Sequence, residues 1–259
     1  MILLTDQLGQ IEVKPIKAFE PFTKGQVLLV EVETAALPTT AILKVFDPKY
    51  INERRCGSKV YEWTAKAEMD AMQQRGTGAY EHWIQLDDYD EDSEQAAAME
   101  EEGLALLMSK SYESEKGAYQ ALRPMQGRHI PRLYAYGTVQ TEPARALNPF
   151  FVLIEYVVNA VKLSDIKEPL SSDVQKVAAD LCSAVDQFAS LGVIHTDINR
   201  NNILVCPDRV VLIDFGCAGV RSLFDYVDMT EEEQQEEWEL GVAQNQDSRW
   251  IRHEFGVPT

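Results

Sequence analysis

Residues 195–204 read HTDINRNNIL and residues 209–216 read RVVLIDFG, and these two stretches decide the fold. They contain two short apolar runs, NILV at 202–205 and RVVLID at 209–214, separated by Cys206-Pro207-Asp208. Short apolar runs joined by turn-forming residues are typical of a β-hairpin. The sequence therefore predicts a small hairpin that is preceded by a polar loop and ends on an acid.

A helix is expected directly before the polar loop. Ser172 opens it, and Gln175 stands three residues on as its capping-box partner. Gly192 closes it. The apolar residues of this helix recur at helical offsets and form one face: Val174, Val177, Ala178, Leu181, Val185 and Phe188.

A strand-rich half precedes this helical half, and the two halves join near residues 157–161. The strands expected from runs of β-branched residues are 11–17, 26–34, 40–46 and 151–156. The stretch between the last two strands is mostly helical, with helices expected at 58–76 and 112–123.

Three charged residues interrupt apolar surroundings. Lys44 lies within an otherwise apolar strand and shares a face with Ile42 and Phe46 by the two-residue period of a strand. Asp197 and Asp214 each follow an apolar run closely. A buried charge is costly unless it has a partner or a metal. Each residue alone has an ordinary structural explanation, but the three together indicate a functional site.

These stretches resemble the protein-kinase fold, whose motifs are H-x-D-x-x-x-x-N, D-F-G and an upstream strand lysine. Residues 195–202, 214–216 and 41–46 match those motifs, in the family's order along the chain. More narrowly, the chain resembles the divergent kinase-like proteins abundant in fungi. That likeness is carried by ILKVFDPKY, EKGAYQALRPMQGRHIPRLYAYG and HTDINRNNIL.

The resemblance implies an α+β, bilobal, protein-kinase-like fold. Residues 1–156 would form an antiparallel-sheet N-lobe with a helical and acidic insertion at about 47–110. Residues 157–259 would form a reduced, mainly helical C-lobe that carries the catalytic loop and D-F-G. A lid or an acceptor-binding element is the role expected of the insertion.

The resemblance also implies ATP and Mg²⁺ as cofactors and a hydroxyl acceptor. Asn202 and Asp214 would supply oxygen ligands suited to Mg²⁺. Lys44 would neutralise the α- and β-phosphates, and Asp197 would accept or orient the proton of the acceptor hydroxyl. His195 is expected to be structural and to hold the loop against the turn before Asp214.

The family pairs the strand lysine with a Glu that has apolar residues three, four and seven positions further on. Glu115 meets this pattern and Glu113 is its rival, so Glu115 is the expected partner of Lys44. From Glu115 those positions hold Ala118, Tyr119 and Leu122. From Glu113 they hold Lys116, Gly117 and Gln120.

The segment FFVLIEYVV resembles the hinge between kinase lobes. By that likeness the Glu155 carbonyl and the Val157 amide would face the adenine edge, with Ile154 as gatekeeper. Ile42 and Leu204 would sandwich the adenine ring, although plain core packing explains these two residues equally well.

The chain departs from the family pattern in several places. AFEPFTKGQ replaces the glycine-rich phosphate loop and offers only Gly25, with Lys24 as a partial substitute. Thr196 replaces the motif arginine, Asn199 stands where a lysine is usual, and no A-P-E follows. Only 43 residues follow Gly216. Two functions stay open: an ATP-dependent phosphotransferase with a protein or small-molecule acceptor, or a pseudokinase that binds nucleotide or serves as a scaffold.

The amino-acid composition limits the classes of molecule that this chain is expected to bind. The 259 residues include 42 acids against 24 bases, a net charge of −18, which disfavours nucleic acid and anionic membranes. Acidic runs at 87–102 and 225–239 are expected to be solvated faces, with partner binding as the alternative. No apolar stretch is long enough to span a membrane, and no signal peptide is recognisable. A cytoplasmic or nuclear location is expected.

The four cysteines stand far apart in the sequence, which disfavours a disulfide framework or a zinc site. Reduced thiols are therefore expected, and Cys217 is expected to be a half-buried one.

Overall fold

The computed structural model describes residues 1–22, 24–51, 54–56, 59–60, 62–75, 94–245 and 247–258. The chain packs into two compact units. The first comprises Met1–Tyr112 and Tyr134–Ile154, and the second comprises Glu113–Leu133 and Glu155–Thr259. Residues 113–133 thus pack with the second unit. The lobe boundary expected at 156/157 rests on the family likeness and stays a prediction.

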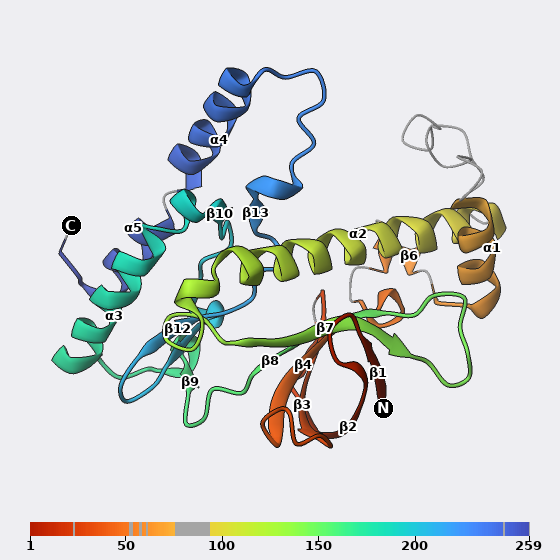
Figure 1. Cartoon of the computed structure of the whole chain (residues 1–259), viewed down its shortest axis with the longest axis horizontal. Helices are drawn as coiled ribbons and strands as arrows, with labels where there is room; N and C mark the ends of the chain where they lie inside the picture. Colours follow the sequence, from red (N-terminus) through yellow and green to blue (C-terminus); the bar gives the residue numbers. More distant parts are fainter. Residues whose placement is uncertain are drawn as a thin grey trace. The chain divides into compact units, whose positions relative to one another are not determined.

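The first unit is built on a closed β-barrel (Figure 1). Its strands follow the order β1 (Ile2–Thr5), β2 (Gly9–Ala18), β3 (Gln26–Val32), β4 (Thr40–Phe46), β8 (Phe150–Glu155) and β7 (Leu133–Gln140). The four strands expected from the sequence are confirmed. The sequence patterns did not predict β1 and β7, and the antiparallel β1–β7 pair closes the barrel.

The barrel interior is filled by alternate residues of its strands. On β4 these are Ala41, Leu43 and Val45, which belong to one buried cluster with residues of the other five strands. Ile42, Lys44 and Phe46 therefore lie on the other face, as the two-residue period predicted.

Two helices accompany the barrel strands in the first unit. Helix α1 (Ala65–Arg75) lies within the range expected at 58–76. Helix α2 (Glu94–Ala121) is far longer than the helix expected at 112–123, and it runs from the first unit into the second. A small two-stranded sheet of β5 (Arg55–Cys56) and β6 (Lys59–Val60) precedes them.

Two acids of the first acidic run are buried rather than solvated. Glu101 accepts hydrogen bonds from both terminal nitrogens of Arg54, at 2.8 and 2.6 Å. Glu102 pairs with Arg75 at 2.8 Å. The expected solvated face is therefore wrong at this end of the run, because two arginines compensate the buried charges. The part of the run at 87–93 lies outside the described residues.

A second buried ion cluster ties the β7–β8 connection to the end of β4. Arg145 donates to Asp47 from both terminal nitrogens, at 2.7 and 3.1 Å, and also contacts Glu68 of α1. Burial alone would raise the pKa of Glu68, but hydrogen bonds from Arg145 and Trp63 hold that pKa below its usual value. One guanidinium thus compensates two buried carboxylates.

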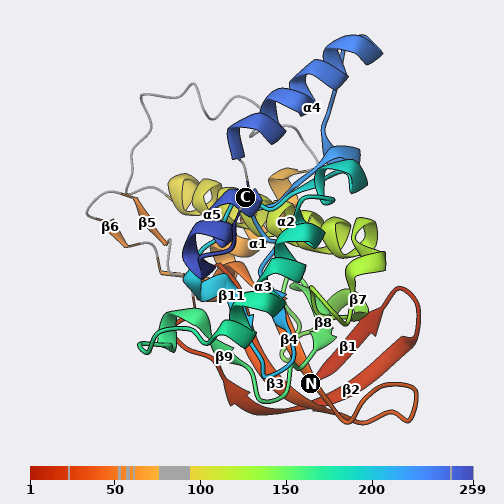
Figure 2. The same cartoon turned by 90° about the vertical axis from the view of Figure 1, so that its left-hand side faces the viewer.

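The second unit contains the predicted hairpin. Strands β11 (Ile203–Val205) and β12 (Val210–Leu212) pair antiparallel, and β9 (Val161–Lys162) pairs with β11 on its other side. A second short sheet joins β10 (Val193–Ile194) to β13 (Gly219–Val220). Figure 2, turned by 90° from the view of Figure 1, shows β9, β11 and α3.

Helix α3 (Ser172–Val185) buries the predicted apolar face, but its cap differs from the prediction. Ser171, not Ser172, is the N-cap, and its hydroxyl accepts from the Val174 amide at 3.3 Å. The capping box with Gln175 is therefore wrong by one residue. The end predicted at Gly192 is also wrong, because α3 ends at Val185. Gly192 caps the following 3-10 turn, η5 (Ala189–Leu191), with a left-handed φ of 78°.

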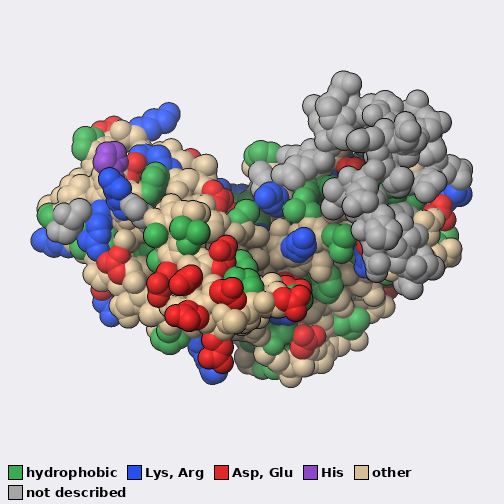
Figure 3. Space-filling model, turned by 90° about the horizontal axis from the view of Figure 1, so that it is seen from above, with side chains coloured by type: hydrophobic (Ala, Val, Ile, Leu, Met, Phe, Trp, Pro, Cys, Tyr) green, Lys and Arg blue, Asp and Glu red, His purple; other side chains and the backbone are tan. Residues whose placement is uncertain are grey.

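Two helices end the second unit, α4 (Glu231–Asn245) and α5 (Asp247–Phe255). The acids of α4 are exposed while Trp238 is buried, so the solvated face expected for the second acidic run is confirmed. Figure 3, which looks down on α4, shows acidic side chains gathered on this face. Among the described residues, no helix is long and apolar enough to cross a membrane.

We predict that Arg145→Met lowers the free energy of unfolding by about 3–5 kcal/mol, because it leaves Asp47 and Glu68 buried without a cation. Urea unfolding at pH 7 measures the loss. The loss should shrink below pH about 4, since a carboxylate with a lowered pKa stabilises the fold only while it is ionised.

Arg128→Met is the matched control. The Arg128 side chain is 70% exposed in its ion pair with Asp180, so its removal should cost less than about 1 kcal/mol. Equal losses for the two variants would contradict the assignment of a buried cluster to Arg145.

Candidate functional site in the second unit

The His195 side chain is buried beneath the polar loop, and two contacts fix its position. Its backbone amide donates to Asp247 Oδ2 at 2.6 Å. Its ring Nε2 lies 3.1 Å from the Ile213 carbonyl oxygen. The expectation that His195 holds the loop against the turn before Asp214 is therefore confirmed.

The hydrogen bonds of His195 define its tautomer. The Asp197 amide donates to Nδ1 at 3.3 Å, so Nδ1 is the acceptor and the proton sits on Nε2, facing Ile213. Burial lowers the pKa of His195 below its usual value, although the Ile213 carbonyl and nearby carboxylates favour the charged form. The ring is thus a neutral structural element at physiological pH.

Asp197 is held by two asparagines from the same loop. Asn202 Nδ2 donates to the Asp197 carbonyl at 2.9 Å and to Oδ2 at 3.1 Å. Asn199 Nδ2 donates to Oδ1 at 2.9 Å. Both carboxylate oxygens therefore accept a neutral donor, which orients the group and leaves its negative charge without a bonded cation in these contacts. Asn199, noted only as a departure from the family, thus has a local role.

The hairpin brings Asn202 beside the turn that carries Asp214. The Ile213 amide donates to the Asn202 carbonyl at 2.9 Å, and Ile203 pairs with Leu212. Because Asn202 Nδ2 is bonded to Asp197, the amide oxygen of Asn202 points away from that bond. Asp214 follows directly and is half-buried.

Two residues of this region have left-handed backbone conformations that are uncommon outside glycine. Thr196 has a φ of 63° and Asp214 a φ of 67°. A β-branched residue in that region is strained unless its surroundings hold it. The Thr196 hydroxyl donates to the Cys217 carbonyl at 2.7 Å, which ties the two unusual turns together. Cys217 itself is exposed, so the half-buried thiol expected there is wrong.

Phe215 packs in an aromatic cluster beneath the loop. Its ring centroid lies 4.7 Å from that of His195, 5.3 Å from Tyr119 and 6.2 Å from Phe188. Tyr119 lies on α2 four residues after Glu115, and both are buried. Burial raises the pKa of the Tyr119 phenol well above its usual value, so it stays neutral. The cluster links α2, α3 and the D-F-G turn.

Helix α5 supports the polar loop at several points that the sequence analysis missed. Its first residue, Asp247, accepts from the His195 amide, and Glu254 pairs with Arg200 of the loop. Arg252 also pairs with Asp186, just after α3. The sequence carried no signal for these contacts, since they join residues 52 to 66 positions apart.

Lys44 and Ile42 belong to the first unit. The Lys44 side chain is buried, and its Nζ lies 5.3 Å from the centre of the Phe46 ring. The backbone of Gly25 approaches it so closely that an added Cβ would lie 3.1 Å from Lys44 Cε. The pairing of Lys44 with Glu115 stays a prediction. Glu115 is nonetheless the buried acid, whereas Glu113 is partly exposed and pairs with Lys116.

The expected adenine-binding residues have ordinary packing partners in the second unit. Val157 belongs to a buried cluster with Cys206 and Val211, and Leu204 packs against it. The Glu155 carboxylate accepts from Arg209 at 2.9 Å and from the Arg132 amide at 3.1 Å. The adenine contacts assigned to their backbones and to Ile42 stay predictions.

The donor set fits a magnesium site completed by substrate. The described residues contain no group of three or more His, Cys, Asp or Glu that could hold a metal. Mg²⁺ bound with a nucleotide typically takes only one or two protein oxygens, the phosphates and waters supplying the rest. Asn202 and Asp214 meet that lesser requirement, and both are oxygen donors.

Comparison with known proteins gives a class for this region. Residues 108–221 match the family model of the RIO domain, an atypical protein-kinase-like domain. Those residues include Glu115, Asp197, Asn202 and Asp214, whereas Lys44 lies outside them. The match and the helices and sheets of the two units confirm the predicted kinase-like α+β class. Over residues 108–221 the chain is thus similar to the protein-kinase-like superfamily.

The individual relatives are kinases. The chain is 30% identical over 115 residues to serine/threonine-protein kinase D of Synechocystis sp., covering 42% of this chain and 20% of the relative. The kinase domain of Mycobacterium tuberculosis PknI is similar with a TM-score of 0.41 and 16% identity, over 79% of this chain and 58% of that one. A point mutant of the same domain gives a TM-score of 0.41 at 15% identity, over 79% and 59%. The chain spans about a fifth of the length of the Synechocystis kinase.

We predict that Asp247→Ala speeds hydrogen exchange at the His195 amide by about tenfold or more, because a hydrogen bond to a charged acceptor is lost. Exchange followed by NMR or mass spectrometry measures the change. Asp247→Asn keeps an acceptor oxygen and should retain most of the protection. Faster exchange confined to the amides of α5 itself would show that Asp247 supports only its own helix.

Proposed function

We propose that the chain is an ATP-dependent phosphotransferase of protein-kinase-like fold, which transfers the γ-phosphoryl group to a hydroxyl acceptor. One observation carries this proposal. Asn199 and Asn202 hold the Asp197 carboxylate by neutral hydrogen bonds, and the hairpin brings Asn202 beside Asp214. An oriented carboxylate next to two oxygen ligands matches what phosphoryl transfer requires.

Asp197 accepts the acceptor hydroxyl's proton as the new oxygen–phosphorus bond forms. The bond from the γ-phosphorus to the bridging oxygen breaks, and ADP leaves. Asn202 and Asp214 would hold Mg²⁺, which supplies charge neutralisation at the phosphates when bound. Lys44, held by Glu115, neutralises the α- and β-phosphates.

ATP would lie with its adenine edge against the Glu155 carbonyl and the Val157 amide, between Ile42 and Leu204. The acceptor is a protein or a small molecule that carries a hydroxyl group, in a cytoplasmic or nuclear setting. Within the superfamily, we propose that the chain stands nearest the divergent kinase-like proteins abundant in fungi, with a minimal C-lobe.

A pseudokinase is the second candidate, and the segment before β3 favours it. AFEPFTKGQ contains a single glycine, Gly25, whose backbone lies against the Lys44 side chain. A loop with several glycines would offer more amides for close approach to phosphate. Nucleotide binding without turnover would identify this alternative.

We predict that Asp197→Asn abolishes transfer of labelled phosphate from ATP while Mg–ATP binding stays within about twofold. Loss of a positioned base typically costs about 10²–10⁴ in rate. The measurement is turnover with pooled protein and small-molecule acceptors, together with the ligand-induced shift in melting temperature.

Two variants serve as controls for Asp197→Asn. Asp214→Asn should lose both Mg–ATP binding and turnover, whereas Asp208→Asn, on the turn of the hairpin, should change neither. Loss of Mg–ATP binding in Asp197→Asn would contradict the proposed role of Asp197 as the base that accepts the hydroxyl proton. Wild-type protein that binds Mg–ATP without any transfer would support the pseudokinase.

We predict that Lys44→Ala and Glu115→Ala lower activity non-additively, because two members of one ion pair act as a unit. The double variant should be little worse than either single one in kcat/KM. Glu113→Ala is the control and should leave the rate nearly unchanged. Additive losses would mean that Glu115 does not hold Lys44.

A further inference from the structure

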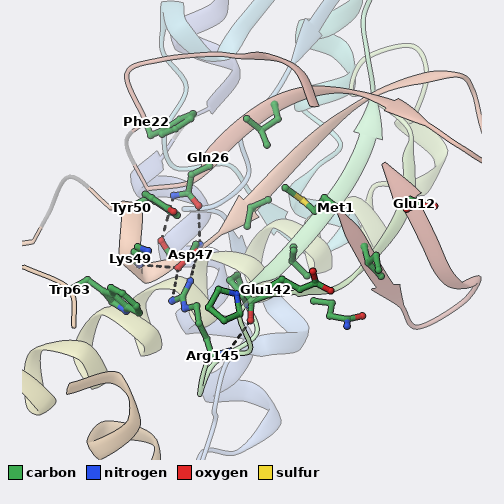
Figure 4. Close-up of a pocket in the computed structure, with 18 residues that line it drawn as sticks. Met1, Glu12, Phe22, Gln26, Asp47, Lys49, Tyr50, Trp63, Glu142 and Arg145 are labelled. Atoms are coloured by element: carbon green, nitrogen blue, oxygen red, sulfur yellow. Dashed lines mark hydrogen bonds and ion pairs between the residues drawn. The ribbon is translucent and has the colours of Figure 1, made fainter. Parts of the chain in front are cut away.

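The first unit contains a cavity of about 680 Å³ at one mouth of its β-barrel (Figure 4). Leu28 of β3, Val45 of β4 and Val139 of β7 line its apolar part. The mouth of a barrel is a common place for small-molecule sites, and this volume suits such a ligand. The phosphotransfer chemistry proposed above uses none of the residues that line it.

Three charged side chains that line this cavity have no oppositely charged partner among the described parts of the chain. They are Lys49, Glu12 and Glu142. The other charged lining groups are Asp47 and Arg145, which are bonded to each other, and the N-terminal ammonium of Met1, which donates to the Val13 carbonyl at 2.9 Å. Among the side chains of the cavity, one cation and two carboxylates thus remain for a ligand to neutralise.

These charges lie at different ends of the cavity. Figure 4 shows Lys49 beside Tyr50 and Trp63 at one end, and Glu12 at the far end, with Glu142 between them. The Lys49 ammonium lies 4.1 Å from the centre of the Trp63 ring and 5.3 Å from that of Tyr50. Aromatic faces hold this ammonium in place but leave its positive charge available to an anion.

The surrounding ion cluster makes the site rigid. The Asp47 side chain caps the turn that carries Lys49, accepting from the Lys49 amide at 3.0 Å, and it is held in turn by Arg145. Trp63 donates to Glu68 at 2.9 Å, which fixes the ring against which Lys49 rests. The cationic end is therefore preorganised, and this lowers the cost of binding.

We propose that this cavity binds a small dipolar molecule, with a carboxylate directed to Lys49 and an ammonium or guanidinium directed to Glu142 and Glu12. An apolar chain between the two charges would cover the barrel mouth. An amino acid with a long basic side chain belongs to this chemical class. The site shares no residue with the catalytic set proposed above and does not depend on its activity.

Three probes of equal chain length test the proposal on the whole wild-type chain: 6-aminohexanoate, hexanoate and hexylamine. The first carries both charges, and each of the others carries one. Calorimetric titration should show 6-aminohexanoate binding about fivefold more tightly than either congener, since Glu12 and Glu142 are exposed and each exposed ion pair contributes modestly. Equal binding of all three, or no binding of 6-aminohexanoate, would overturn the proposal.

Charge-removing variants test the orientation. Lys49→Met should reduce 6-aminohexanoate binding to the level of hexylamine, and Lys49→Arg should restore it. Glu142→Gln combined with Glu12→Gln should reduce it to the level of hexanoate. Lys176→Met, an exposed lysine of the second unit, is the control and should change nothing. If 6-aminohexanoate bound all these variants equally, its site would lie elsewhere and the assignment would fail.

Discussion

The buried imidazole of His195 organises the loops of the second unit. Its Nε2 proton faces the Ile213 carbonyl, its Nδ1 accepts from the Asp197 amide, and its own amide reaches Asp247 of α5. A buried polar ring is stable only when its hydrogen bonds are made, so loss of one of these contacts is expected to weaken the others. Phe215 packs on the ring and thereby fixes the turn that carries Asp214. The geometry of the two acids follows from this one side chain.

Local patterns predicted the elements that carry the site. The hairpin, the face of α3 and the alternation on β4 all follow from periods of two or 3.6 residues, which short stretches reveal. Ser171 and Ser172 are equally suitable N-caps by residue type, so the sequence could not distinguish them. In the structure Ser171 is the N-cap, because its hydroxyl accepts from the Val174 amide. The pattern therefore predicted the helix but neither its N-cap nor its last residue.

Long-range contacts could not be predicted in the same way. Strand β1 closes the barrel by pairing with β7, more than 130 residues away. The support from Asp247 likewise depends on where α5 folds back against the loop. Such contacts are set by packing of whole elements, and one sequence contains no periodic signal for them.

Acidic composition alone gave an incomplete account of the charges. A run of acids suggested a solvated face, yet Glu101 and Glu102 are buried because Arg54 and Arg75 fold onto them. The same principle explains why Asp47 and Arg145 compensate each other in the barrel mouth. A charge informs function only after its partner is known, since a paired charge is structural and an unpaired one attracts a ligand. The ligand proposed for the barrel mouth and the hydroxyl acceptor proposed for Asp197 both rest on charges that have no oppositely charged partner in the contacts given above.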